Sequence, residues 1–533
     1  MYDMPIPHLG DFADFEEEPL QEKCGIVALF STTKDINQQL TYTLLAASGV
    51  QHRGQLGGGI AYITPDGIFR YTGNGLIKDL FTPSVLKTFP KPRIVRWTML
   101  HCRYGTDGGY SDENLQPTLA KAGDGTEVTV MHNGQFVATH LMRKRLKKLL
   151  NREFPEELSD TYLFTQLLAL SEGKSWDEIV VKTLSEVNGA YSLIIGIADT
   201  LYLARDTFGI RPLMIGRLNG GWIAASETHA LEKVGVKIER EIQRGEIVAI
   251  NKTGLRVLQK GIGGMGNFCD FEWAYFSRPN AQYPTHERKN DNSYSKDWLS
   301  TLVFRERCGK ILAKDYPIPD ADFVVGVPDS GVAVATGYAA GAGLSYRQVI
   351  LRDHYDPSGN KRLFLGDDQM ELIESKVLGK LSLVQDPEVW KGKIVVIGDD
   401  SIVRGNVTRK ITKAIFDLGA KEVHWIVGFP PVMYTCHLGV SMRTPKELIA
   451  HRHNGDVKKI AQEIGATSVN YISHLGLVMS RRDSGKIVKP KNAQELILVN
   501  GGCGGCVTGV YPINNDGTIT HPTDSLKPNS PNV

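Results

Sequence analysis

The amino-terminal half of the chain shows short apolar runs separated by turn residues. Closely spaced strands interrupted by a few helices are typical of helix layered on antiparallel sheet. We therefore expect this arrangement over residues 24–260. Strand-like runs lie at residues 58–63, 128–131 and 191–196, and helix-like segments lie at residues 141–150 and 161–170.

From about residue 320 the pattern changes to apolar run, loop and helix, repeated along the chain. Single strands that alternate with helices are the signature of a parallel sheet covered by helices. The second half is therefore expected to be an α/β domain. Its expected strands are residues 323–327, 345–351, 394–397 and 423–427.

The two ends of the chain follow neither pattern. Residues 1–23 are acidic and end where an apolar run begins with Cys24, so we interpret them as a leader. The last twenty residues are rich in Asn, Pro, Asp, Ser and Thr, a composition typical of a disordered tail. The predicted organisation is a leader at 1–23, a first domain at 24–260, a second domain at 261–475 and a carboxy-terminal segment at 476–533.

Composition excludes several classes of protein. The chain has 533 residues, which is enough for two or three domains, with 41% hydrophobic and 23% charged residues, as in soluble globular enzymes. Lys and Arg number 61 against 59 Asp and Glu, so no nucleic-acid partner is expected. No apolar run approaches the ~20 residues of a membrane span. Seven cysteines in so long a chain do not suggest a secreted disulfide framework, and we expect a cytoplasmic protein.

The most informative stretch is residues 394–408, an apolar strand that ends in Asp399 and Asp400. Ligands of parallel sheets bind beyond the carboxyl ends of the strands. Adjacent carboxylates there can hold sugar hydroxyls and a hard divalent cation. Gly405 lets backbone N–H groups approach a phosphate at the start of a helix that begins near Thr408. The stretch therefore predicts a phosphate and metal site.

This stretch resembles the phosphoribosylpyrophosphate motif of type I phosphoribosyltransferases, in the form found in the amidophosphoribosyltransferase family. The resemblance implies that Ser330, Asp399 and Asp400 surround Mg²⁺. A loop after another apolar strand is similar to the family's pyrophosphate loop, and it contains Asp329, Ser330 and Gly331. The residues implied for the 5-phosphate are Ser401, Arg404, Gly405 and Thr408.

Three features depart from the family pattern. Asn406 and Val407 stand where the family usually has two threonines, so hydroxyls that face the phosphate are changed. The loop that closes over the substrate, residues 352–380, has altered basic positions and an insertion around 356–361. Because a closing loop excludes water and completes the site, these changes can shift the substrate or slow the reaction.

The first half resembles the class II glutamine amidotransferases, whose nucleophile is an amino-terminal cysteine. Four segments carry this resemblance, in the family's order: residues 51–55, 101–106, 132–134 and 159–161. A thiol at a chain start can use its own α-amino group as a general base, because that group has a pKa near ~8. The resemblance implies cleavage between Lys23 and Cys24, and a four-layer αββα amino-terminal-nucleophile (Ntn) hydrolase domain.

The same resemblance implies roles for four further residues. Asn133 and Gly134 match the oxyanion hole, which stabilises the tetrahedral intermediate of amide hydrolysis. Arg103 and Asp160 match the groups that bind the carboxylate and the amino group of glutamine. A bidentate guanidinium and a carboxylate suit these two charges. Each residue taken singly also fits a structural role, and only the set favours a glutaminase.

Four cysteines form a further candidate site. Cys503 and Cys506 form a CxxC pair, a spacing that lets two thiolates reach one metal centre. Cys269 and Cys436 stand where the iron–sulfur branch of the family has its other two ligands. A structural [4Fe–4S] cluster is the favoured occupant. Zinc also accepts four thiolates and is the alternative.

Taken together, these resemblances predict a two-domain pentosyltransferase of purine synthesis that uses glutamine and phosphoribosylpyrophosphate to make 5-phosphoribosylamine. They also imply a homotetramer, inhibition by purine nucleotides and an ammonia tunnel whose use is coupled to loop closure. Two alternatives stay open. One is an amidotransferase with a different ammonia acceptor, which the altered loop favours, and the other is a regulatory protein that binds the ligand without turnover.

Overall fold

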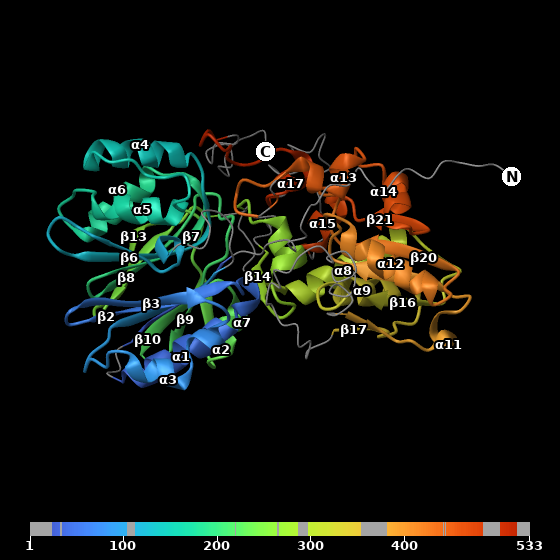
Figure 1. Cartoon of the computed structure of the whole chain (residues 1–533), viewed down its shortest axis with the longest axis horizontal. Coiled ribbons are helices and arrows are strands. Elements are labelled where there is room, and N and C mark those ends of the chain that lie inside the picture. Colours follow the sequence, from blue (N-terminus) through green and yellow to red (C-terminus); the bar gives the residue numbers. More distant parts are fainter. Residues whose placement is uncertain are drawn as a thin grey trace, which may run out of the picture.

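The computed structural model shows two halves side by side, the amino-terminal half in blue to green and the carboxy-terminal half in yellow to red (Figure 1). The acidic leader 1–23, the loop positions 353–380 and residues 520–533 of the expected tail lie outside the described residues. The described residues are 24–31, 35–103, 112–218, 220–263, 266–285, 297–352, 381–440, 442, 444–482 and 501–519.

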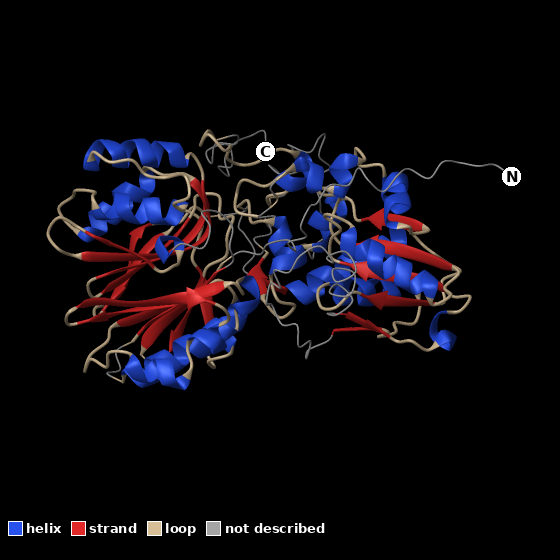
Figure 2. Cartoon of the chain, in the orientation of Figure 1, coloured by secondary structure: helices blue, strands red, loops and turns tan. Residues whose placement is uncertain are grey.

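The amino-terminal half contains two antiparallel sheets that pack face to face (Figure 2). Seven strands form the first sheet, in the order β11 (Ile238–Glu241), β9 (Met214–Leu218), β10 (Gly221–Ala225), β1 (Gly25–Phe30), β4 (Trp97–Arg103), β2 (Gly57–Thr64) and β3 (Gly67–Asn74). Six strands form the second sheet, in the order β13 (Gly254–Gln259), β12 (Ile247–Asn251), β8 (Thr200–Arg205), β7 (Gly189–Ile197), β6 (Glu127–Phe136) and β5 (Thr118–Lys121).

Both faces of each sheet are covered, which explains why strands such as β1 are apolar at every position. Ile26 and Phe30 of β1 pack into the core between the sheets, whereas Val27 and Leu29 pack outward. Helix α1 (Ile36–Ser48) and the short helices α2 (Ile77–Leu80) and α3 (Pro83–Thr88) cover the first sheet. Helices α4 (Thr139–Leu150), α5 (Asp160–Ala169) and α6 (Trp176–Ser185) cover the second sheet. The expected four-layer αββα fold is confirmed.

The carboxy-terminal half is built on a parallel sheet, as expected. Its strands lie in the order β16 (Phe323–Gly326), β19 (Ile394–Asp399), β20 (Glu422–Val427) and β21 (Ser468–Tyr471). One face packs against α8 (Thr301–Asp315) and α9 (Gly331–Ala342), and the other against α12 (Asn406–Asp417) and α14 (Val457–Ile464). The longest described helix, α8, has 15 residues, so no helix in the described ranges is long enough to cross a membrane.

Two expectations about this half are wrong in part. Residues 345–351 are not one strand: Tyr346 forms a single bridge with Val324, and β17 (Ile350–Arg352) then leaves the sheet to pair with β18 (Leu381–Leu383). This antiparallel ribbon holds both ends of the segment 353–380. Within this ribbon Leu351 and Arg352 are exposed, and the charge of Arg352 would be costly inside the buried parallel sheet.

The expected disordered tail is also wrong for residues 514–519. The Asn515 carbonyl accepts a hydrogen bond from Ala138 N at 3.0 Å, and the Gly517 carbonyl accepts one from Asn188 Nδ2 at 3.3 Å. Asp516 caps a turn by accepting from Thr518 N at 2.9 Å. This polar segment therefore forms a turn that docks on the amino-terminal half.

Candidate active sites and cysteine cluster

The predicted nucleophile lies where the first sheet ends. Strands β1 and β4 are antiparallel with Gly25 opposite Cys102, so Cys24 lies beside Arg103. The Cys24 residue is half-buried and the Arg103 side chain is buried. Cys102 is fully buried, and burial raises the pKa of its thiol, so it is a core residue and not a second nucleophile.

The predicted oxyanion hole lies on β6 of the second sheet. Asn133 is buried, and its Nδ2 lies 3.5 Å from Ser226 Oγ, which in turn accepts a hydrogen bond from Ile26 N at 3.1 Å. Ser226 therefore connects Asn133 to β1, the strand that directly follows Cys24. Gly134 has φ of +147°, and a Cβ there would lie 1.8 Å from the Ala190 carbonyl oxygen, so only glycine fits.

Asp160 is held next to the same strand. It begins α5, whose first turn is capped by Ser159. One Asp160 oxygen accepts a hydrogen bond from Phe136 N of β6 at 2.7 Å, and the other accepts from Thr161 N at 2.7 Å. This carboxylate, which the sequence assigned to the amino group of glutamine, thus binds the backbone of β6 two residues along the strand from Gly134.

Two buried histidines lie in this region and were not assigned by the sequence. The His132 ring Nδ1 lies 3.1 Å from Thr161 Oγ1 and 3.6 Å from Asp160 Oδ2, and burial lowers its pKa. Burial, followed by the charges of Arg103 and His132, lowers the pKa of His101 to about 3. Both rings are therefore neutral at neutral pH, and the His132 ring lies beside Asp160.

The second site lies at the carboxyl end of β19, as predicted. Asp400 accepts hydrogen bonds from Ser330 Oγ and from Ser401 Oγ, the latter at 2.6 Å. Burial raises the pKa of both Asp399 and Asp400, and the charge of the adjacent Asp400 raises the pKa of Asp399 further. The buried carboxylate of Asp400, the half-buried carboxylate of Asp399 and the Ser330 hydroxyl are hard oxygen donors, so these three residues fit Mg²⁺.

The loop that follows has the geometry of an anion site. Gly405 has φ of +88° and precedes the first residue of α12, so backbone N–H groups point out of the helix start. Thr408 is buried, Val407 is 42% exposed, and Arg404 forms an ion pair with Glu447 at 2.6 Å. The departure at Val407 therefore places an apolar side chain in solvent next to this loop.

The predicted pyrophosphate loop lies on the neighbouring strand end. Gly331 begins α9, and a Cβ there would lie 2.5 Å from the Gly398 carbonyl oxygen, so the loop packs directly on β19. Asp329 forms an ion pair with Arg352 at the base of the β17–β18 ribbon. The pyrophosphate loop and the start of the predicted closing loop are therefore in contact.

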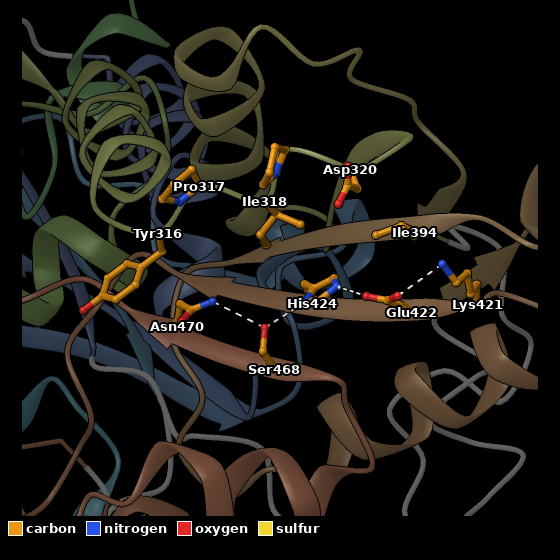
Figure 3. A pocket seen from close by; sticks show the side chains of 11 residues that line it. Tyr316, Pro317, Ile318, Asp320, Ile394, Lys421, Glu422, His424, Ser468 and Asn470 are labelled. Atoms are coloured by element: carbon orange, nitrogen blue, oxygen red, sulfur yellow. Dashed lines mark hydrogen bonds and ion pairs between the residues drawn. The ribbon is translucent and has the colours of Figure 1, made fainter.

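A separate cavity of about 440 Å³ lies at the opposite edge of this sheet (Figure 3). It is lined by the starts of β19, β20 and β21. His424 lies 2.8 Å from Ser468 Oγ and 3.1 Å from Glu422 Oε2, so its ring nitrogens are satisfied within the wall. Because ligands of parallel sheets bind at the carboxyl ends of the strands, this cavity is not the substrate site.

The four predicted cysteine ligands converge at one place. Cys269 and Cys503 form a parallel bridge, and the Cys506 carbonyl accepts hydrogen bonds from the backbone N–H groups of residues 433 and 434. Burial, and next the other cysteines, raise the pKa of the Cys503 and Cys506 thiols. Burial and then all four thiols raise the pKa of Tyr511, which therefore lies beside the whole set.

Four soft thiolates are the donor set of an iron–sulfur cluster, which spreads its ligands over several irons, whereas zinc requires all of them on one ion. In the described part of the chain, no three His, Cys, Asp or Glu side chains lie close enough together to hold a single metal ion. Cys308 is buried in the core elsewhere.

The chain is similar to known proteins over both halves. Residues 103–233 match a family model described as a glutamine amidotransferase domain. The amidophosphoribosyltransferase of Rattus norvegicus is 33% identical and aligns over 94% of this chain and 99% of its own length. The enzyme of that name from Bacillus subtilis is 31% identical over 96% of this chain and 99% of its own length.

Solved structures give the same result. The glutamine phosphoribosylpyrophosphate amidotransferase from B. subtilis, complexed with ADP and GMP, superposes with a TM-score of 0.77 at 31% identity. The superposition covers 93% of this chain and all of that one. A structure described as the allosteric regulatory enzyme of purine biosynthesis also gives a TM-score of 0.77, over 94% of this chain and 97% of that one.

Proposed function

Because the chain belongs to the amidophosphoribosyltransferase family, we propose that it hydrolyses glutamine at Cys24 and uses the ammonia at Asp399 and Asp400. The chain is a pentosyltransferase with glutamine amidotransferase activity, and it acts in the first step of purine biosynthesis. Its substrates are glutamine and phosphoribosylpyrophosphate, and its products are 5-phosphoribosylamine, pyrophosphate and glutamate.

In the proposed glutamine reaction, the Cys24 thiol attacks the side-chain amide and its own α-amino group accepts the proton. This role requires cleavage after Lys23, so residues 1–23 are proposed to be a propeptide. The Nδ2 of Asn133 and the N–H of Gly134 donate to the oxyanion. Support comes from the buried position of Asn133 and from its connection to β1 through Ser226. Removing one such donor costs about 3 kcal/mol in other acyl-transfer enzymes.

Two charged groups are proposed to bind the ends of glutamine. Arg103 binds the α-carboxylate and Asp160 the α-amino group. In support, Arg103 lies opposite Cys24 at the end of the first sheet, and Asp160 is fixed by backbone N–H groups next to Gly134. The two charges orient the side-chain amide of the substrate toward the thiol.

In the proposed transfer reaction, Ser330, Asp399 and Asp400 hold Mg²⁺. When bound, the cation supplies positive charge that stabilises the departing pyrophosphate. The raised pKa values of these two carboxylates support this role, because a cation favours their ionised forms. The backbone at Asp329, Ser330 and Gly331 binds the pyrophosphate, and residues 401–408 bind the 5-phosphate at the start of α12.

The four cysteines are proposed to hold a structural [4Fe–4S] cluster, with zinc as the alternative. Their convergence next to Tyr511 supports a shared metal centre. None of the seven cysteines, all of which lie in the described ranges, forms a disulfide. Reduced thiols suit a cytoplasmic location, which we also propose. Metal and sulfide analysis of anaerobically purified protein separates the cluster from zinc.

The remaining assignments extend the proposal to the whole chain. A glutaminase domain at 24–260, a transferase domain at 261–475 and a carboxy-terminal segment at 476–533 are proposed to assemble as a homotetramer. Inhibition by purine nucleotides is also proposed, supported by the ADP and GMP in the similar B. subtilis structure. Light scattering and inhibition assays with the two nucleotides test these points.

One observation carries the proposal: the same chain has a glutaminase constellation around Cys24 and paired carboxylates with a phosphate loop at β19. The test is magnesium-dependent pyrophosphate release from phosphoribosylpyrophosphate. Release that requires glutamine or ammonia supports the proposal. Glutamate formation without pyrophosphate release contradicts it, and would show that the departures at Asn406, Val407 and residues 352–380 have changed the acceptor.

A further inference from the structure

Arg53 contacts the carbonyl of the nucleophile and two carboxylates at the same time. Its Nε donates to Cys24 O at 3.4 Å, and its Nη1 donates to Glu227 Oε1 at 2.7 Å. Its two terminal nitrogens also bind both oxygens of Glu272, at 2.9 and 2.8 Å. Because Arg53 is fully buried, these carboxylates and not solvent fix its orientation.

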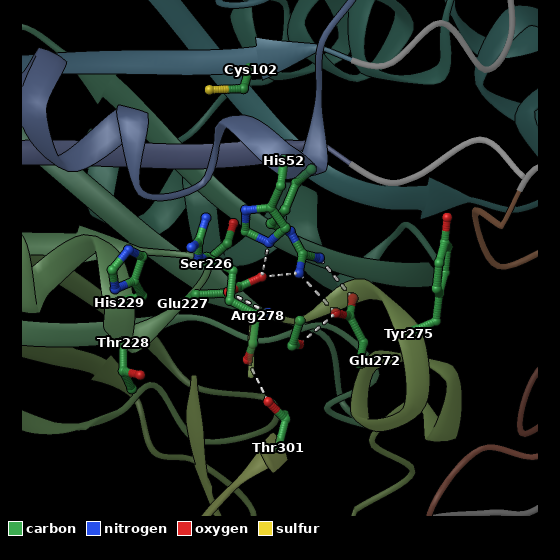
Figure 4. Close-up of polar contacts among 12 residues, drawn as sticks. His52, Cys102, Ser226, Glu227, Thr228, His229, Glu272, Tyr275, Arg278 and Thr301 are labelled. Carbon is green, nitrogen blue, oxygen red and sulfur yellow. Dashed lines mark hydrogen bonds and ion pairs between the residues drawn. The ribbon is translucent and has the colours of Figure 1, made fainter. Parts of the chain in front are cut away.

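Glu272 does not belong to the two sheets that carry the glutamine site. It begins η3 (Glu272–Phe276), a single π-helical turn on the segment that leads into the second half. Turns of this kind occur frequently at functional sites. Figure 4 shows Glu272 on this turn, facing Glu227 and His52. Glu272 is fully buried and also accepts a hydrogen bond from Arg211 Nη1 at 3.2 Å.

The charges in this network are balanced. We use the name junction network for Arg53, Arg211, Glu227 and Glu272, two cations and two anions. Burial raises the pKa of Glu227, but the charges of His52 and Arg53 outweigh it and lower the pKa to about 2. Glu227 is therefore ionised at any working pH, and Arg53 keeps this partner when the contact with Glu272 is removed.

The second half holds the same π-helical turn through Arg305 of α8. Arg305 Nε donates to Trp273 O at 3.1 Å, and its Nη2 donates to Ser277 O at 2.6 Å. Burial lowers the pKa of Arg305, and the charge of Asp400 is the largest effect that opposes it. The turn thus lies between Arg53, which contacts Cys24, and an arginine in the field of the phosphoribosyl site.

We propose that Glu272 is a positioning residue for glutamine hydrolysis. It holds Arg53 against the Cys24 carbonyl, and because it lies on the turn that Arg305 fixes, the position of the nucleophile depends on the second half of the molecule. The inference rests on the proposed function and adds to it a specific residue through which the two sites communicate. The other interpretation is a buried ion pair that only stabilises the junction between the two halves.

The test uses the E272Q variant of the full chain and measures two reactions. Glutamate formation is followed against glutamine concentration, with saturating phosphoribosylpyrophosphate and Mg²⁺, and pyrophosphate release is followed with ammonia in place of glutamine. A displaced nucleophile lowers kcat about 10- to 100-fold. The KM for glutamine, set by Arg103 and Asp160, stays within about threefold, and the ammonia reaction stays within about twofold.

The matched control is E246Q. Glu246 is also buried and binds both terminal nitrogens of an arginine, Arg240, at 2.7 and 2.9 Å, but it lies on another part of the same half. It is expected to lose thermal stability without a selective change in kcat for glutamine. If E272Q does not fold, the double variant R211Q/E272Q removes one charge of each sign and keeps Glu227 on Arg53.

Two results overturn the proposal: an E272Q protein with the kcat of the wild type, or an equal fall in kcat in E246Q. Failure of the proposed function looks different. In that case the wild type forms glutamate but releases no pyrophosphate with glutamine or ammonia, and the comparison of E272Q with E246Q in glutamate formation still decides the role of Glu272.

Discussion

The two active sites treat buried charge in opposite ways. At the glutamine site, the junction network pairs each charge with an opposite one, and backbone N–H groups hold Asp160. At the phosphoribosyl site, Asp399 and Asp400 lie next to each other, and within the described ranges neither forms an ion pair with a basic side chain. The charges of the junction network are therefore balanced in the folded chain, whereas the second site has two carboxylates without a basic partner.

This difference fits the substrates of the two reactions. Glutamine is a zwitterion with no net charge, so its site needs one cation and one anion in fixed positions. Phosphoribosylpyrophosphate is a polyanion, so two adjacent carboxylates at its site require a cation between them, such as the proposed Mg²⁺. Activity at the glutamine site is expected to depend on individual side chains. Activity at the phosphoribosyl site is expected to depend on the bound cation as well.

The largest effect is expected from C24A, which should abolish the glutamine-dependent activity and leave the ammonia-dependent activity intact. Without the thiol, glutamine-dependent pyrophosphate release falls by at least ~1000-fold, because no other group can form the covalent intermediate. Ammonia-dependent release stays within about twofold. A control variant, C102S, removes the neighbouring thiol and keeps both activities. Loss of the ammonia reaction in C24A would show that the two sites are not separate.

A smaller loss, about 100-fold, is expected from D400N in the ammonia reaction. The amide removes one of the paired charges that Mg²⁺ requires, whereas glutamate formation without phosphoribosylpyrophosphate is unchanged. Thermal melting gives an independent measurement. Saturating Mg²⁺ with pyrophosphate stabilises the wild type by ~2 to 3 kcal/mol, a rise of several degrees in Tm, and D400N loses that rise.

A change of only about three- to tenfold is expected from the N406T/V407T variant, which restores the two family threonines. One added hydroxyl at a phosphate contributes about 1 kcal/mol, and Val407 is already exposed next to the loop. The KM for phosphoribosylpyrophosphate is expected to fall while the KM for glutamine stays the same. An unchanged KM would mean that helix-start N–H groups alone bind the phosphate.

The smallest effect is expected from pH, through His101 of the glutamine site. Burial first, then Arg103 and His132, lowers its pKa from 6.5 to about 3 in the folded protein. The unfolded chain therefore takes up the proton first, and stability present above pH 6.5 is lost as pH falls toward 3. From pH 7 to 5.5 this amounts to about 1 kcal/mol, measured by urea unfolding. The H101Q variant is expected to lose less stability over this interval.

Local features of both sites were predicted from sequence. The strand that ends at Asp399 and the loop at Gly331 follow from short stretches of chain, because turn chemistry is local, whereas the four-layer fold was implied by the resemblance to class II glutamine amidotransferases. The strand at 345–351 failed because β17 pairs with β18, which lies about 30 residues further along the chain, and an apolar run does not indicate its pairing partner. Residues 514–519 failed because their docking partners, Ala138 and Asn188, lie more than 300 residues away.

The sequence by itself determined the residue types at each site, the order of the two domains and the four cysteines, since motifs preserve chemistry over a few neighbouring residues. Only the tertiary structure showed that Arg53 reaches Glu272, 219 residues away, while contacting Cys24 O. The physical reason is that a buried ion pair forms wherever packing brings opposite charges together in a low-dielectric interior. That packing depends on how the two halves meet, and hydrophobic periodicity indicates only which side chains are buried.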